Sequence, residues 1–182
     1  MIYGSTLIGP ALVAAVIAGL VTMIGWYVAY QRERRLDNGR RAERIRDCKI
    51  ALRAEISCHV PRWIMQDETG HVEEMAKQII AGTGETPPFT PFVPKETANP
   101  AFEAIVSEIQ ILPGDVIEPV IRYYQQVDVI AQLAEDMRGE RYAALEAERK
   151  IDVYRDFIEL RSEAGRLAID AIDALEQSSD DK

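Results

Sequence analysis

The stretch LIGPALVAAVIAGLVTMIGWYVAY, residues 7–30, decides how this chain is built. Residues 1–31 contain no Asp, Glu, Lys, Arg or His, and the arginine-rich sequence QRERR, residues 31–35, follows at once. A helix rises about 1.5 Å per residue, so about 20 residues cross the roughly 30 Å hydrocarbon core of a bilayer. The 24 residues of this stretch therefore predict a transmembrane helix, within an anchor that covers residues 1–31.

A cleaved signal peptide is the competing interpretation of this N-terminus. Signal peptides have a basic n-region, a shorter apolar core and small residues at the cleavage site. Here no charged side chain precedes the apolar stretch, the stretch is longer, and arginines follow it as in a stop-transfer signal. Tyr3 at one end and Trp26, Tyr27 and Tyr30 at the other lie where aromatic belts occur. These features favour an uncleaved signal-anchor.

Residues 32–53 form the basic juxtamembrane start of the next helix, with nine Lys or Arg side chains against four Asp or Glu. Lys and Arg beside a transmembrane helix stay in the cytoplasm. We therefore expect an inner (plasma) membrane protein with its N-terminus outside and residues 32–182 cytoplasmic. These arginines are also candidates to contact anionic lipid headgroups, at about 1 kcal/mol each, although setting the topology is by itself a sufficient reason for them. The candidate lipid contacts are Arg32, Arg34, Arg35, Arg40 and Arg41.

Small residues recur at four-residue intervals within the span, at Ala11, Ala15 and Gly19. Such a strip lets a second transmembrane helix approach closely, so these residues are the candidate helix–helix contact. A passive anchor is the alternative, because Ala and Gly are common in membrane helices in general.

The body of the chain has the opposite charge to the juxtamembrane region. The whole chain carries −9, and residues 32–53 carry +5, so residues 54–182, with 12 basic and 26 acidic side chains, carry −14. A nucleic-acid partner would need a basic face, and the acidic body argues against one. Cys48 and Cys58 lie on the predicted cytoplasmic side, where a stable disulfide is not expected.

The cytoplasmic part has the apolar periodicity of helices, and no segment alternates with the period of two that strands require. We expect helices at about residues 40–59, 62–81, 100–109, 115–137 and 141–177, with residues 178–182 frayed. Asp37-Asn38-Gly39 either interrupts the first helix or lies within it, and Pro61 ends it, kinks it or opens the next. The predicted fold is all-α: a single N-terminal transmembrane helix followed by an acidic antiparallel helical bundle over residues 54–177.

Residues 82–99 are predicted to be a loop, because four prolines follow Gly82-Thr83-Gly84. Phe89, Phe92 and Val93 alternate with these prolines, whereas a disordered tether is poor in aromatic residues. We therefore expect the loop to pack against the bundle. The alternative is a proline-rich ligand for an aromatic groove on another protein.

The candidate chemical groups do not form a recognisable site. Cys48, Cys58, His59 and His71 lack the paired spacing of zinc ligands, so the cysteines are expected to be small buried residues. Glu68 and His71 form a single E-x-x-H, whereas di-iron bundles need two. His59 lies on an apolar stripe and is predicted to be a core histidine with a backbone or Glu partner. No nucleophile elbow, P-loop or glycine-rich dinucleotide turn occurs. We predict no catalytic, cofactor or metal site and no enzyme activity.

Short motifs follow the basic helix: ALRAEI at residues 51–56, IQILPGDVI at 109–117 and a tyrosine pair at 123–124. In this arrangement the chain resembles a loose group of small single-pass bacterial and phage-associated membrane proteins with a cytoplasmic helical domain. The resemblance implies the architecture and no particular activity.

The expected function is that of a membrane-anchored cytoplasmic helical protein acting through protein–protein contacts, as a scaffold or interaction module. Its partner would be another protein or a second copy, bound through a bundle face or the loop at residues 82–99. No small-molecule substrate is identified. The alternative is an oligomerising membrane-active effector or regulator whose anchor self-associates through Ala11, Ala15 and Gly19.

Overall fold

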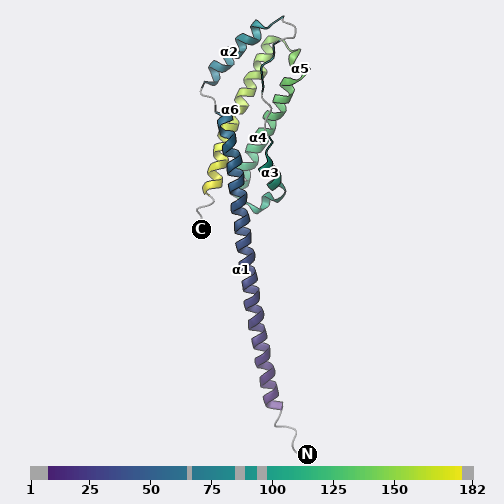
Figure 1. The fold of residues 1–182 in the computed structure, drawn as a ribbon, viewed down its shortest axis with the longest axis vertical. Coiled ribbons are helices and arrows are strands. Elements are labelled where there is room, and N and C mark those ends of the chain that lie inside the picture. Colours follow the sequence, from purple (N-terminus) through teal and green to yellow (C-terminus); the bar gives the residue numbers. More distant parts are fainter. Residues whose placement is uncertain (1–7, 65–66, 85–88, 94–97, 178–182) are drawn as a thin grey trace, which may run out of the picture. The chain divides into compact units, whose positions relative to one another are not determined.

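The computed structural model describes residues 8–64, 67–84, 89–93 and 98–177, with side chains from Ala14 onward. Within these residues it contains helices and no β-strand, so the all-helical fold class is confirmed (Figure 1). The elements are α1 (Ile8–Trp63), α2 (Glu68–Ala81), α3 (Pro100–Ile105), the 3₁₀ helix η1 (Val106–Ile111), α4 (Gly114–Arg138), α5 (Glu140–Ala143) and α6 (Ala147–Gln177). The chain divides into two compact units, Met1–Ile45 and Arg46–Lys182, and α1 contributes to both.

In the first unit the described residues belong to α1 alone. Asp37, Asn38 and Gly39 lie inside this helix and do not interrupt it. A glycine in a helix costs only about 0.5–1 kcal/mol relative to alanine, which one position in a long helix tolerates. Asp37 lies 4.0 Å from Arg40, one turn along the same face. Of the two alternatives for this tripeptide, the helix that continues through it is confirmed.

The last turn of α1 contains Pro61, and the helix ends two residues later at Trp63. The second helix was predicted from residue 62, but α2 begins only at Glu68. Its start is determined by Asp67, whose Oδ1 accepts a hydrogen bond from the Gly70 N–H at 2.9 Å. A carboxylate in this position satisfies one of the unpaired N–H groups at a helix start, so α2 begins where its cap lies.

The second unit is built around α4 and α6, which pack along each other. α2 packs on α6 and α5 on α4 (Figure 1), and side chains from residues 46–63 of α1 complete the core. The buried apolar side chains of α1, α4 and α6 are Leu52, Ile56, Trp63, Val116, Val120, Tyr123, Tyr124, Val127, Ile130, Ala134, Met137, Tyr154, Phe157, Ile158, Ala164, Ala168, Ala171 and Leu175. They follow the spacing of three and four residues that the sequence predicts for each helix.

Small residues on α6 let α1 approach it closely. Gly165 lies opposite Trp63, and a Cβ atom added at Gly165 would lie 3.4 Å from the Cβ of Trp63. Ala164 and Ala168 on the same helix are fully buried. The Trp63 indole is thus accommodated because its neighbours on α6 have almost no side chain.

The apolar spacing along α4 predicts a buried face that includes either Tyr123 or Tyr124. The buried face is confirmed, and both tyrosines lie in the core. Regular helix begins at Gly114 and not near Pro119, which lies inside α4. Proline lacks an N–H, so at this position it removes the helical bond to the carbonyl of Asp115. Only this one hydrogen bond is lost, close to the start of the helix, and α4 continues past Pro119.

Two predicted helices differ from the structure at their boundaries. The helix expected from residue 100 begins at Pro100 but changes to the 3₁₀ form after Ile105. The last helix was predicted from residue 141, but α6 starts at Ala147. The short α5 and a turn at Ala144 precede it, which leaves Leu145 outside the helix and 37% exposed. In both cases the apolar periodicity continues through a break in the backbone hydrogen bonding.

The assignment of residues 46–63 to the core can be tested with two neighbouring substitutions. Leu52 is 0% exposed and Ile50 is 60% exposed on the same helix. Leu52→Ala should lower the free energy of unfolding by about 2–5 kcal/mol, because it leaves a cavity in the core. Ile50→Ala should change it by less than about 0.5 kcal/mol. Denaturant unfolding of the detergent-solubilised full chain, followed by circular dichroism, measures both. Equal losses for the two variants would contradict the assignment.

Candidate functional site

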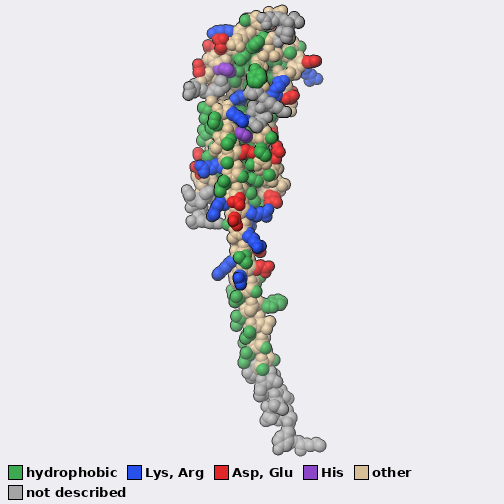
Figure 2. Space-filling model, viewed as in Figure 1, with side chains coloured by type: hydrophobic (Ala, Val, Ile, Leu, Met, Phe, Trp, Pro, Cys, Tyr) green, Lys and Arg blue, Asp and Glu red, His purple; other side chains and the backbone are tan. Residues whose placement is uncertain are grey.

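The apolar part of α1 in the first unit presents its side chains outward on every side. All side chains from Ala14 to Tyr30 are exposed, and Figure 2 shows this segment covered by hydrophobic side chains until the first arginines. Of the helices in the described part of the chain, α1 is the one that is long and apolar enough to cross a membrane. Such a surface is stable only where its surroundings are apolar.

The candidate helix–helix contact lies within this segment. Ala15 and Gly19 are exposed, and a Cβ added at Gly19 would meet no other atom within 4 Å. The side chain of Ala11 lies outside the described residues. The space beside Ala15 and Gly19 is open, and a contact there with another helix stays a prediction.

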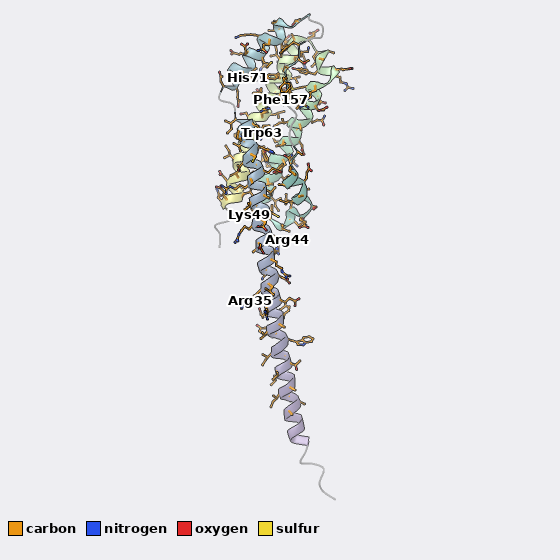
Figure 3. The ribbon with its side chains drawn as sticks, viewed as in Figure 1. Arg35, Arg44, Lys49, Trp63, His71 and Phe157 are labelled. Atoms are coloured by element: carbon orange, nitrogen blue, oxygen red, sulfur yellow. The ribbon has the colours of Figure 1, made fainter. Side chains whose placement is uncertain are left out.

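The candidate lipid contacts also lie on the exposed surface of α1. Arg32, Arg34, Arg35 and Arg41 are exposed, as is Arg40, which approaches Asp37 to 4.0 Å. Figure 3 labels Arg35 on this helix. A surface ion pair of this kind contributes about 0–1 kcal/mol. The arginines are therefore accessible to lipid phosphates, and both interpretations of them, lipid contact and topology alone, remain predictions.

In the second unit, the carboxylate of Glu55 connects three helices. Its Oε2 accepts a hydrogen bond from the Ala101 N–H at 2.7 Å, and its Oε1 accepts one from the Phe102 N–H at 3.2 Å. The Tyr124 hydroxyl donates to the same Oε1 at 2.6 Å, and the Tyr124 ring stacks on Phe102 with centroids 3.9 Å apart. Burial, together with the hydrogen bond to Glu55, raises the pKa of Tyr124. Glu55 thus caps the start of α3 from another helix.

An Asn followed by Pro at the first helical position predicts that Asn99 caps this helix, and that prediction is wrong. The Asn99 side chain makes no capping hydrogen bond, and its buried Oδ1 has no partner in the described part of the chain. The two N–H groups at the start of α3 instead bond to Glu55, 46 and 47 residues away in sequence. A charged acceptor makes a stronger hydrogen bond than a neutral amide oxygen. This difference accounts for the use of Glu55 in place of Asn99 as the cap.

His59 is a core histidine, as predicted, but its partner is a tyrosine. Its Nδ1 lies 2.9 Å from the Tyr123 hydroxyl, which also accepts a hydrogen bond from the Trp63 Nε1–H at 3.2 Å. The indole can only donate, so the tyrosine hydroxyl oxygen is the acceptor in that bond. Desolvation lowers the pKa of His59, nearby Arg62 lowers it further, and Glu55 opposes them. The neutral imidazole is the form that fits this site.

The second histidine also bonds to a tyrosine. His71 Nε2 lies 2.7 Å from the Tyr154 hydroxyl, which joins α2 to α6 (Figure 3 labels His71). Burial raises the pKa of Tyr154, against the effect of Arg161. Burial and then the neighbouring Tyr154 raise the pKa of Tyr142 to about 12. These tyrosines are therefore neutral hydrogen-bonding groups that hold the helices together.

The residues considered as metal ligands are dispersed. Within the described ranges, no three His, Cys, Asp or Glu side chains gather closely enough to hold a metal ion. Cys48 is half-buried and Cys58 is exposed. The expectation that both cysteines are buried is therefore wrong for Cys58, which faces outward on α1.

A groove of about 650 Å³ lies at the junction of α4, α5 and α6. Its apolar lining consists of Leu133, Met137, Tyr142, Leu145 and Val153. Its polar side chains are Glu135, Asp136 and Glu140 against a single cation, Arg141. The groove therefore combines an apolar floor with a net negative charge.

The loop that follows α2 presents an exposed aromatic side chain. Phe92 is 88% exposed, whereas its neighbours Pro91 and Val93 are buried. Arg138, between groove residues 137 and 139, donates from its Nε to the Val93 carbonyl at 3.2 Å. The expected packing of the loop thus holds at Pro91 and Val93 and fails at Phe92. Residues 85–88 and 94–97, with Pro87, Pro88 and Pro94, lie outside the described residues.

Comparisons with known proteins identify no relative. No protein-family model, no curated protein and no solved structure matches this chain.

The partners of Glu55 and His59 and the exposure of Phe92 were not predicted from the sequence. The only available signal was the Tyr123-Tyr124 pair on the apolar stripe of α4, since buried tyrosine hydroxyls need hydrogen-bonding partners. The identity of those partners depends on which helices meet, and helical periodicity does not specify it.

The protonation of His59 should destabilise the fold. The lowered pKa means that the unfolded chain, with a His pKa near 6.5, takes up the proton more readily than the folded chain. The stabilisation is complete above that pKa and is lost as the pH falls through it and towards the folded-state pKa. Between about pH 8 and pH 5.5, the free energy of unfolding should fall more for the wild type than for His59→Gln. Denaturant titrations at several pH values measure this difference, and identical slopes for the two proteins would contradict it.

Proposed function

We propose that this chain is a membrane-anchored interaction protein. In this proposal residues 7–30 cross the inner (plasma) membrane with the N-terminus outside, and residues 32–182 lie in the cytoplasm. The exposed apolar side chains of α1 and the arginines that follow them support it. A transmembrane helix satisfies its backbone internally and buries such side chains in lipid, while cytoplasmic Arg and Lys hold the orientation.

The cytoplasmic domain in this proposal is an antiparallel helical bundle that works as a rigid platform. Short connections between α4, α5 and α6 support the antiparallel arrangement, as does the packing of α4 on α6. The buried tyrosines and histidines hydrogen-bond to one another inside this domain. They hold the helices in place. Because these polar groups bond to one another, they support a function that works through contacts with partners and not through catalysis.

The observation that carries the proposal is the exposure of Phe92 between two buried neighbours. If an exposed phenylalanine lay on a flexible segment, that segment would have to become ordered on binding, which costs conformational entropy. Here Pro91 and Val93 are buried and the Val93 carbonyl is bonded to Arg138, so the backbone on both sides of Phe92 is held. Aromatic side chains presented in this way are typical anchors of protein–protein interfaces.

The groove at the junction of α4, α5 and α6 indicates the chemistry of the partner. Its apolar lining would accept an aliphatic or aromatic side chain, and its three acidic side chains against one cation would attract a basic segment. The partner is therefore a protein surface with an apolar pocket for Phe92 and basic residues around it. Another protein and a second copy of this chain both meet this description.

The topology can be tested by protease digestion of intact cells. If residues 32–182 are cytoplasmic, protease added outside should leave the domain whole, and it should be digested once the membrane is permeabilised. Immunoblotting for a C-terminal epitope measures the outcome. A cytoplasmic protein of known location provides the control for cell integrity. Digestion from outside would contradict the orientation.

The binding surface can be tested by site-specific cross-linking in the native membrane. With p-benzoylphenylalanine in place of Phe92 of the full chain, ultraviolet light should produce a discrete adduct, identified by mass spectrometry as another protein or a second copy. The matched control places the same residue at Ile169, which is 47% exposed on α6. The Phe92→Ala substitution should reduce chemical cross-linking to the same protein at least about tenfold, as expected for a hot spot worth about 1.4 kcal/mol or more. Equal cross-linking from both positions, or none from position 92, would contradict the proposal.

A further inference from the structure

A small cavity lies where the turn after α2 meets the start of α6. Its volume is about 140 Å³, and water in the liquid occupies about 30 Å³ per molecule, so it has room for a group of only a few heavy atoms. The lining includes the turn residues Gly82, Thr83 and Gly84 and the side chain of Lys150. The apolar side chains of the lining are Ile79, Phe89, Ala143, Leu145 and Ala147.

Lys150 is unusual in this cavity because it is a buried cation. The residue is only 5% exposed, and its ammonium has no hydrogen bond or ion pair to any described residue. Its backbone is engaged, since its N–H donates to the Glu146 carbonyl at 3.0 Å and its carbonyl accepts from the Tyr142 hydroxyl at 3.2 Å. The backbone is therefore held, and Lys150 lines the cavity. An ammonium without a protein partner can bind an anion that enters the cavity.

The start of α6 adds to the positive character of the cavity. Lys150 is the fourth residue of α6, and Ala147, which also lines the cavity, is the first. The first N–H groups of a helix have no partner within the helix, and the helix dipole makes this end favourable for an anion. The buried ammonium and the helix start therefore favour negative charge at the same place.

The other lining groups define the class of anion. Lys150 is the one cation among the described residues that line the cavity, and Glu146, which also lines it, opposes a doubly charged anion such as phosphate. The walls formed by Ile79, Phe89 and Leu145 are apolar and would contact a short hydrocarbon group. A singly charged carboxylate with a short apolar group satisfies both conditions.

We propose that Lys150 and the start of α6 form a binding site for a small aliphatic carboxylate. The ammonium binds the carboxylate oxygens, and the hydrocarbon group lies against Ile79, Phe89 and Leu145. This site shares Leu145 with the groove of α4, α5 and α6, but its chemistry does not depend on the proposed function. Two sources present the same chemistry: a free short-chain carboxylate, and the C-terminal residue of a protein.

Lysine signals in the NMR spectrum of the full chain test the site directly. The chain has five lysines, Lys49, Lys77, Lys95, Lys150 and Lys182, so labelling lysine with ¹³C gives few Cε signals, and Lys150→Met identifies the one from Lys150. Sodium butyrate, added at constant ionic strength to the detergent-solubilised protein, should shift the Lys150 signal in a saturable manner. Lys77 is the internal control, because it lies on the surface of α2 and pairs with Glu74.

Further arms of the same titration distinguish the sources and the class of anion. A short peptide that ends in alanine with a free carboxylate tests the protein source, and the same peptide with an amidated end should produce no shift. Ala143→Leu, which fills the cavity and keeps Lys150, should weaken butyrate binding at least tenfold. The proposal is overturned if neither butyrate nor the free-acid peptide shifts Lys150, if Lys77 shifts equally, if Ala143→Leu binds butyrate as well as the wild type does, or if inorganic phosphate binds more tightly than butyrate.

Discussion

The second unit depends on a set of hydrogen bonds between one face of α1 and the adjacent tyrosines of α4. Glu55, His59 and Trp63 lie four residues apart on α1, and each contacts Tyr123 or Tyr124. Polar groups buried in this way are stable only when every partner is present, because a lost partner leaves a desolvated donor or acceptor. The contacts therefore align α1 with α4 in a particular register, which apolar packing alone would specify less strictly.

The alignment of α1 with α4 also positions the start of α3 and the loop that contains Phe92. Because Glu55 bonds to the start of α3, the segment that leads into α4 is held next to α1. The opposite end of α4 then supplies Arg138, which holds the Val93 carbonyl and with it the exposed Phe92. The polar groups of the core thus bond to one another, while Phe92 remains accessible at the surface.

Much of the fold could be predicted from the sequence. The buried positions of α4 and the fully helical content follow from apolar periodicity, which is a local property. Whether Asp37-Asn38-Gly39 interrupts α1 was left open by the sequence and was decided by the structure. The boundaries of α2 and α6 were less predictable. Apolar periodicity continues on both sides of Asp67, but the hydrogen bond that Asp67 accepts determines where α2 begins. The candidate site was the least predictable part. Lys150 is an ordinary charged residue in the sequence, and only packing between α2 and α6 makes it a buried cation.

The sequence by itself determined the charge-free stretch at residues 7–30, the arginines that follow it and the helical stripes, because each depends on residues close together in the chain. Only the tertiary structure decided that Glu55, and not Asn99, caps α3 and that His59 bonds to Tyr123. Only the tertiary structure left Phe92 exposed beside buried neighbours. The physical reason is that hydrogen-bond partners and burial are set by residues tens of positions apart, and the pattern of neighbours along the chain does not specify which of them will meet.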